Sequence, residues 1–321
     1  MALLVALALL CPAAAQEGGR PPGRILVPRD TALWLVQLAS GAGQPLTPDS
    51  GTSLVLDAAL TPDGQQAVYS RLLYPSPNNL GGADLYLVPT AGGDSRLLRA
   101  HDAPGVLLTT PTWSADGRSV LYTYTPYGMM NPTDPASQTR IERVTLDGST
   151  PTIVLPEATS PSLSADGRLL TYLHSTRFGD ALWVADGDGT NGREVVPDNR
   201  FLGLAYPRLS PDGSRIAVAA TADLAAPPTP SLPRGSGRWH LASVAAAHGL
   251  PWDIWLVNTD GSGLRRLTHM LEDDPSVAWS PDGQWLAIQG GSGLTLVDVA
   301  SGRTQRVSRD AAFGAIDWGR E

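Results

Sequence analysis

One four-residue pattern, Ser or Thr, then Pro or Ala, then Asp-Gly, occurs five times in this chain. The copies lie at residues 61–64, 114–117, 164–167, 210–213 and 280–283. The pattern suits a tight β-hairpin: the hydroxyl can bond to the turn backbone, Pro sets φ for a type I turn, and Gly supplies the residue of positive φ. A hairpin that recurs every 46 to 70 residues predicts a repeat architecture.

Each copy is flanked by short apolar segments typical of β-strands. Around the last two copies, these segments lie at residues 276–279 before a turn, 215–218 after a turn, and further on at 253–257 and 264–268. Several are almost continuously apolar, which indicates antiparallel sheets buried on both faces. Four short strands per unit, stacked around an axis, form a β-propeller.

The ends of the chain complete the unit count. Five full units span residues 53–100, 106–157, 158–198, 204–269 and 274–308. A further first strand lies at 314–318, with Trp318 in register with Trp279, and outer strands lie at 32–36 and 44–47. Joining the two ends makes a sixth blade and removes exposed sheet edges.

The sequence therefore predicts an all-β fold, a six-bladed propeller of four-stranded antiparallel blades closed by pairing of the N- and C-terminal strands. We expect this domain over residues 31–321, with an excursion at 222–252 that accounts for the longest repeat interval. Residues 16–30, rich in Gly and Pro, are expected to form a flexible leader.

The repeat resembles that of TolB-type six-bladed propellers. The resemblance is carried by W-S-P-D-G at 279–283 and I-W-L-V-N-T-D-G-S-G-L-R-R-L-T at 254–268, and it covers about residues 31–321. Members of the bacterial envelope Tol system also carry a separate N-terminal α/β domain, which a short leader does not supply. Glu142 and Thr295 stand where other repeats have Trp or Tyr. The resemblance thus implies the fold and leaves the function open.

The first residues predict an exported protein. Residues 2–10 are apolar and uncharged, too short to span a bilayer and suited to a signal peptide, and the alanines at 13–15 fit a cleavage site. We expect a signal peptide over 1–15 and a periplasmic or extracellular protein. The alternative, a lipid anchor on Cys11, is disfavoured because Leu10 stands where a small residue is expected.

Composition excludes several function classes. A net charge of −8 disfavours nucleic acid and anionic membranes as partners. All 23 basic residues are arginine, which excludes P-loop and Schiff-base lysines, and the single cysteine excludes internal disulfides and thiolate zinc sites. The chain also lacks GxSxG and HExxH motifs. We assign no catalytic residue, and these absences favour a non-enzymatic protein.

Alternating strand direction sorts the connections onto two faces. The repeated tetrapeptides lie on one face, here called the tetrapeptide face. The connections from second to third strand and from blade to blade lie on the other, the connector face. Predicted long loops on the connector face are residues 72–82, 126–138, 176–180 and 222–252. Long loops on a rigid scaffold carry binding residues, so we expect any site there.

Acidic residues recur in the blade-to-blade connectors. They are Asp49, Asp102, Glu157, Asp198, Glu272, Asp273, Asp274 and Asp310. Because these connectors run from rim to centre, their acids are expected to surround one mouth of the axial channel, as a negative funnel for a cation, a basic peptide or a protein. The alternative is that they are solvated loop acids that bond turn amides.

Loop aromatic and apolar residues form a second candidate set. Its members are Tyr74, Tyr127, Met129, Met130, Phe178, Trp239 and Trp252. Exposed together, they would form a partner-binding patch. The alternative is that they fold under their own loops.

Metal binding rests on four weak candidates. His101 and His269 lie in blade connectors near acids, and Asp186 and Asp188 resemble part of a calcium loop. We expect no organic cofactor. These residues leave open the binding of a divalent cation.

Three functions follow from these features. The first is an exported, monomeric scaffold that binds an envelope protein or peptide through the connector face and the acidic channel mouth. The alternatives are a metal-dependent lyase or hydrolase with its site in the channel, and a propeller that binds carbohydrate or another small ligand.

Overall fold

The computed structural model describes residues 20–75, 81–126, 138–225 and 251–320. Every regular element in these residues is a β-strand. The strands are β1 (Arg24–Arg29), β2 (Ala32–Gln37), β3 (Gly43–Pro45), β4 (Ser53–Leu60), β5 (Gln66–Leu73), β6 (Gly82–Pro89), β7 (Arg96–Arg99), β8 (Val106–Trp113), β9 (Ser119–Pro126), β10 (Arg140–Thr145), β11 (Thr152–Pro156), β12 (Ala158–Leu163), β13 (Leu169–Thr176), β14 (Gly179–Asp186), β15 (Arg193–Val196), β16 (Phe201–Leu209), β17 (Arg215–Asp223), β18 (Trp252–Asn258), β19 (Arg265–Arg266), β20 (Ser276–Trp279), β21 (Trp285–Gly290), β22 (Gly293–Asp298), β23 (Thr304–Arg306) and β24 (Asp317–Gly319). The described residues thus include no helix that could cross a membrane.

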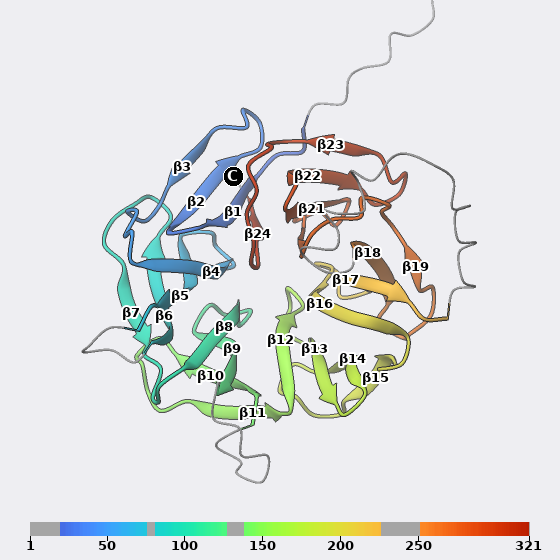
Figure 1. Cartoon of the computed structure of the whole chain (residues 1–321), viewed down its shortest axis with the longest axis horizontal. Coiled ribbons are helices and arrows are strands. Elements are labelled where there is room, and N and C mark those ends of the chain that lie inside the picture. Colours follow the sequence, from blue (N-terminus) through green and yellow to red (C-terminus); the bar gives the residue numbers. More distant parts are fainter. Residues whose placement is uncertain (1–19, 76–80, 127–137, 226–250, 321) are drawn as a thin grey trace, which may run out of the picture.

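The strands pair in antiparallel sets of four, and every set is consecutive in the chain except the one that joins β24 to β1–β3. Four sheets have four strands each, and a fifth has eight because one parallel bridge, Ala83 to Leu107, joins β6 to β8. Divided at this bridge, the pairings give six groups of four strands, which surround a central axis (Figure 1). The signal peptide expected at 1–15 lies outside the described residues.

The two ends of the chain meet in one sheet, with the order β24-β1-β2-β3. Ile25 pairs with Trp318, and Val27 pairs with Trp34. The prediction of a flexible leader over 16–30 is therefore wrong for residues 24–29, which form the buried strand β1. Its apolar core, Ile25 to Val27, is only three residues long, and the flanking Arg, Pro and Gly residues are more typical of a loop than of a strand. The propeller begins before residue 31.

The hydrophobic core lies between neighbouring sheets and not within one central mass. Each cluster of buried apolar side chains draws on two adjacent groups of four strands. Strand β1 shows the pattern: Ile25 and Val27 pack toward the sheet of β20–β23, whereas Leu26 packs toward the sheet of β4–β7. This confirms sheets buried on both faces, as the continuous apolar strands predicted.

The repeated tetrapeptide forms the expected turn. In the third copy, Ser164 Oγ donates to Asp166 Oδ1 at 2.6 Å and accepts from Leu169 N at 3.0 Å. Asp166 Oδ1 also accepts from Arg168 N at 3.0 Å, and Gly167 takes a φ of 71°. The other four copies repeat these bonds. Each turn closes through its own side chains and needs no neighbour.

Arginine side chains link neighbouring sheets on the tetrapeptide face. Each donates from Nη2 to a backbone carbonyl of the next sheet: Arg24 to Gly64 (2.6 Å), Arg143 to Gly187 (3.3 Å), Arg193 to Thr259, Arg215 to Gly283 (3.4 Å) and Arg265 to Val299 (3.1 Å). We call these contacts arginine clips. The long, permanently charged guanidinium suits a bond to a carbonyl across a sheet interface.

Glu142 stands where other repeats have an aromatic side chain, and it is buried. Its two carboxylate oxygens accept from Tyr122 Oη at 2.6 Å and from Arg140 Nε at 2.7 Å. The Arg140 guanidinium lies 3.7 Å from the centre of the Tyr124 ring. The departure from the repeat is thus compensated by a local polar network.

One predicted long loop is short. Residues 176–180 were expected to form a long connection, but β13 ends at Thr176 and β14 begins at Gly179, so only Arg177 and Phe178 lie between them. The connections β1–β2 and β21–β22 are equally short. Residues 76–80, 127–137 and 226–250, which fall within the other three predicted long loops, lie outside the described residues.

Candidate functional site

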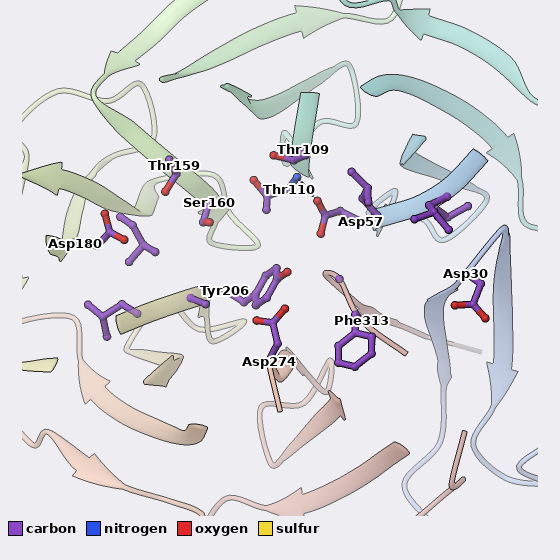
Figure 2. Close-up of a pocket in the computed structure, with 17 residues that line it drawn as sticks. Asp30, Asp57, Thr109, Thr110, Thr159, Ser160, Asp180, Tyr206, Asp274 and Phe313 are labelled. Carbon is purple, nitrogen blue, oxygen red and sulfur yellow. Dashed lines mark hydrogen bonds between the residues drawn. The ribbon is translucent and has the colours of Figure 1, made fainter. Parts of the chain in front are cut away.

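A cavity of about 520 Å³ opens at the axis of the propeller, and its lining comes from all six groups of strands or their connectors (Figure 2). Asp30 lies between β1 and β2, Asp180 is the second residue of β14, and Asp274 lies in the connector before β20. Such connections lie on the connector face, where the sequence predicted a site.

A repeated irregularity in the innermost strands shapes this cavity. Thr110, Ser160 and Tyr206 each lie four residues before the Ser of a tetrapeptide, and each has a positive φ, between 46° and 54°. The strand register shifts at each of these positions, as at a β-bulge. Backbone conformations of this kind are costly for residues other than glycine and gather at functional sites.

Asp57 occupies the same place in β4 and is buried in the channel wall. Its Oδ2 accepts from Thr110 N at 2.8 Å and its Oδ1 accepts from Ala315 N at 2.7 Å. One carboxylate thus joins three neighbouring parts of the ring. Burial raises the pKa of Asp57, and the two amide bonds together with the Arg208 charge oppose that rise.

The connector before β24 passes close to Asp57 and needs a glycine. Gly314 has a φ of 97°, and a Cβ at this position would lie 1.5 Å from the carbonyl oxygen of Leu56. The Leu56 carbonyl is backbone and cannot move aside, so no side chain fits at residue 314.

Tyr206 and Asp274 lie opposite Asp57 in the cavity (Figure 2). Burial raises the pKa of Asp274, and the negative charges of Asp273 and Asp57 raise it further. Burial also raises the pKa of Tyr206 well above its ordinary value, again with contributions from Asp57 and Asp274. The phenol therefore stays protonated and can donate a hydrogen bond.

The cavity is acidic. Its lining includes Asp30, Asp57, Asp180 and Asp274, and among the described lining residues there is no Arg, Lys or His. The lining also carries Thr110, Ser160 and the apolar side chains of Leu204 and Phe313, among others. Burial lowers the pKa of Arg208, while the negative charges of Asp317 and Asp57 oppose that fall.

The eight predicted connector acids do not gather at one place. Asp274 lines the cavity, and the other seven do not belong to its described lining. Asp49 accepts from Thr31 Oγ1 and Gly51 N, Asp198 accepts from Thr176 Oγ1 at 2.7 Å, and buried Glu272 accepts from Ser292 N at 2.9 Å. Asp49 and Glu272 thus bond backbone amides, as in the alternative interpretation, but Glu272 is buried and not solvated, and Asp198 bonds a hydroxyl instead.

Three more connector acids face other groups. Asp102 accepts from Arg99 at 2.8 Å and from Tyr124 Oη at 2.9 Å, and Asp310 lies 3.2 Å from Arg29 Nη1. The carbonyl of Asp273 faces Gly291 N. Glu157 is exposed and has a φ of 51°.

The predicted aromatic patch is described only in part. Tyr127, Met129, Met130 and Trp239 lie outside the described residues. Trp252 is partly buried and packs with the cluster between β17–β18 and β20–β22, so it follows the alternative interpretation. Tyr74 and Phe178 are exposed.

The metal candidates do not converge. His101 Nδ1 lies 2.6 Å from Asp84 Oδ1, and His269 is exposed in a different connector. Asp186 accepts from Asn191 and Asp188 from Thr190. Among the residues with a described placement, no three His, Cys, Asp or Glu side chains are arranged to hold a metal ion.

Sequence reasoning missed most cavity residues, notably Asp30, Asp57, Asp180, Tyr206 and Phe313. One signal was available: Asp57, Thr110, Ser160 and Tyr206 all lie four residues before a tetrapeptide. Counting back from each turn would have placed these four polar side chains at one level of the channel.

Comparison with solved structures identifies the architecture. TolB from Acinetobacter baumannii superposes with a TM-score of 0.66 at 17% identity, covering 95% of this chain and 69% of that one. A putative TolB from Agrobacterium tumefaciens gives 0.55 at 18% identity, covering 77% and 76%. The fold is that of a TolB-like propeller.

A third similar structure is an oligogalacturonate lyase in complex with manganese, with a TM-score of 0.53 at 17% identity, covering 87% of this chain and 70% of that one. No protein-family model and no curated protein matches the sequence. At these identities the likeness concerns the fold alone, so function must be argued from the site.

The carboxyl groups of this fold predict a stability maximum at mildly acidic pH. Burial raises the pKa values of Asp57, Asp274 and Asp317, so lowering the pH toward 3.8 should increase the free energy of unfolding. The tetrapeptide acids, such as Asp166, have lowered pKa values because of their Ser or Thr hydroxyl bonds, so stability should fall below pH 3.8. Urea unfolding measured from pH 3 to 8 should show a maximum in the free energy of unfolding at about pH 4.

Two variants separate the contributions. Asp274→Asn should flatten the rise between neutral pH and the maximum, because Asn carries no charge at any of these pH values. Asp166→Asn should reduce the fall on the acid side. Stability that climbs steadily from pH 4 to pH 8 would contradict the assignment.

Proposed function

We propose that this protein is an exported, non-enzymatic propeller scaffold that binds a protein or peptide through its connector face. The single observation that supports this most is the acidic cavity at the channel mouth, with four carboxylates and no basic side chain in its described lining. Concave sites with a few polar groups on a rigid frame are the usual places for binding.

The electrostatics of the cavity favour a positively charged ligand group. The pKa of Asp274 is raised by burial and by neighbouring carboxylates, so its negative charge is held at a cost in free energy. A cation in the cavity would lower that cost. An acidic cleft with low-dielectric walls also attracts cationic partners over several ångströms and speeds their association.

Export is supported by the apolar residues 2–10 and the alanines at 13–15. A partner would accordingly belong to the cell envelope or its surroundings.

A retention experiment tests the proposal. Purified mature protein is immobilised, incubated with envelope extract at low salt, and washed with increasing NaCl. We expect a discrete partner that is retained at low salt and released as salt rises, because screening weakens attraction to the acidic mouth. The double variant Asp180→Asn, Asp274→Asn should retain markedly less.

Matched variants control for net charge. Asp94 is exposed on the tetrapeptide face, between β6 and β7, and Asp94→Asn should leave retention unchanged. Reversal of Asp102 or Asp198, which bind neighbouring side chains and do not line the cavity, should affect retention less than Asp274→Asn. Absence of any retained partner would refute the proposal.

A metal-dependent lyase or hydrolase is the second candidate, favoured by the similarity to the lyase solved with manganese. Here His101 would be the first ligand to examine, since Asp84 fixes its ring. Metal analysis and thermal shifts with Mn²⁺, Ca²⁺ or Zn²⁺ discriminate this candidate: no bound ion and no shift would exclude it.

A further inference from the structure

Four exposed apolar side chains lie on the connector face beside the cavity. They are Phe178, Leu202, Leu224 and Leu271, with exposed fractions of 71%, 59%, 56% and 61%. We call them the apolar arc. Single exposed leucines need no explanation, but four on adjacent connections of one face form a candidate contact surface.

Hydrogen bonds link the segments that carry the arc to one another. The hairpin that carries Phe178 is joined to the β15–β16 connector by the bond from Thr176 Oγ1 to Asp198 Oδ2, 2.7 Å. Leu224 N donates to Arg200 O at 2.9 Å, which places Leu224 beside the start of β16, where Leu202 lies.

The other end of the arc follows from Trp252. A Cβ at Gly203, next to Leu202, would lie 3.0 Å from the Trp252 ring. Trp252 and Glu272 exchange backbone hydrogen bonds of 2.9 Å and 2.8 Å, and Leu271 precedes Glu272. The segments that carry the arc are therefore neighbours on the connector face: the β13–β14 turn, the start of β16, the end of β17 and the connector to β20.

Three of these segments also supply the cavity. Asp180 is two residues after Phe178, Asp274 is three residues after Leu271, and β16 carries both Leu202 at its start and Tyr206 in the cavity wall. Apolar and acidic surfaces are thus presented side by side on one rigid frame.

Inside the cavity, the groups suit a cationic side chain. The Tyr206 ring lies between Asp57 and Asp274 (Figure 2). Within the described residues, the Asp274 carboxylate forms neither a hydrogen bond nor an ion pair, and Phe313 lines the same cavity with 48% of its surface exposed. Carboxylates with an aromatic face are what a guanidinium or ammonium group binds best.

We propose that the partner presents a polypeptide segment in which an Arg or Lys side chain enters the cavity while neighbouring apolar side chains rest on the apolar arc. This inference rests on the proposed function and names the chemistry of its partner. Charge complementarity selects the occupant: an acidic protein or a polyanion would be repelled by four carboxylates, and a free metal ion would leave the arc uncovered.

Selection from phage-displayed random 12-residue peptides tests this inference and needs no purified partner. Against the immobilised wild-type protein, we expect enrichment of peptides with Arg or Lys next to Leu, Ile, Phe or Trp. The selected peptides, made synthetically, should bind at least about tenfold more weakly when the Arg is replaced by its neutral isostere citrulline, and more weakly as NaCl is raised.

Variants assign the two parts of the surface. Asp274→Asn and Asp30→Asn should weaken binding. Neither variant should strain the backbone, because Asp274 and Asp30 have φ values of 42° and 48° and Asn tolerates this region. Asp30 is exposed, so its variant tests the proposal even if Asp274→Asn folds poorly. Leu202→Ser with Leu271→Ser should remove the apolar preference and keep the basic one.

Controls come from elsewhere on the ring. Asp94→Asn and Leu97→Ser change an exposed acid and a half-exposed leucine away from the connector face, and neither should alter binding. Enrichment of acidic peptides, no enrichment, or equal binding by the arc variants would overturn the inference. So would a concentration-dependent dimer in sedimentation that Leu202→Ser with Leu271→Ser abolishes, since the arc would then bind a second copy.

The retention experiment separates the two proposals. A retained envelope partner whose binding ignores Asp274→Asn, Asp30→Asn and the arc variants would preserve the proposed scaffold function and refute this inference. If no partner is retained, the scaffold proposal is refuted, whatever the peptide selection gives.

Discussion

Replacing Arg208 by methionine should lower the free energy of unfolding at pH 7 by about 3 kcal/mol, because it leaves the buried Asp57 carboxylate and the partly buried Asp317 carboxylate without their cation. The pKa values of Asp57 and Asp317 are raised by burial, and the Arg208 charge counteracts the rise at both residues. Methionine keeps an unbranched apolar stem, although it is shorter than arginine, and it removes the charge. Urea unfolding monitored by tryptophan fluorescence measures the loss.

The pH dependence and a rescue distinguish charge from packing. The deficit of Arg208→Met should shrink toward pH 4, as Asp57 and Asp317 become protonated. Adding Asp317→Asn should recover part of the stability at pH 7. Arg168→Met is the control: the Arg168 side chain is 85% exposed, so its loss should change stability by less than about 0.5 kcal/mol. A deficit equal at pH 4 and pH 7 would show that lost packing, not lost charge, explains it.

Trp318→Ala should cost about 3–5 kcal/mol and, in addition, loosen the seam of the ring. Trp318 is buried against Ile25 and Ile316, and its strand, β24, pairs with β1 through only three residue pairs. Hydrogen exchange should show reduced protection of the β1 amides, residues 24–27, ahead of the rest of the ring.

Trp279→Ala supplies the matched comparison. Trp279 is equally buried and ends an innermost strand, β20, but it lies inside a sheet formed by consecutive chain. Its loss should cost a similar free energy without singling out β1. Trp318→Phe should restore most of the stability. Equal exchange patterns for the two alanine variants would mean that the β24–β1 seam is no weaker than the rest.

The repeated turn made most of the architecture readable from sequence, because its chemistry is local. Ser164, Asp166 and Gly167 close their turn with their own side chains and backbone, so the pattern survives in every copy. Strand β1 escaped notice because its apolar core has three residues between Arg, Pro and Gly. Its identity depends on pairing with β24, nearly 300 residues away.

The candidate site was harder to predict for two physical reasons. Thr110, Ser160 and Tyr206 line the cavity because they lie at β-bulges with positive φ. This conformation cannot be predicted from their residue types. Of the predicted connector acids only Asp274 lines the cavity, because the direction of each side chain depends on the nearest donor. Asp198 turns to the Thr176 hydroxyl and Asp102 to Arg99, while Asp274, with no such donor among the described residues, remains in the cavity.

The arginine clips have a consequence for how repeats of this kind diverge. Each clip bonds to a main-chain oxygen of the adjacent unit, such as those of Gly64 and Val299, and point mutation cannot delete a main-chain oxygen. The receiving unit is therefore free to change its side chains without losing the bond, whereas the donating unit must keep its arginine, as Arg143 is kept in the unit that contains Glu142. Duplicated units joined in this way can diverge in sequence one at a time while the contacts between them are kept.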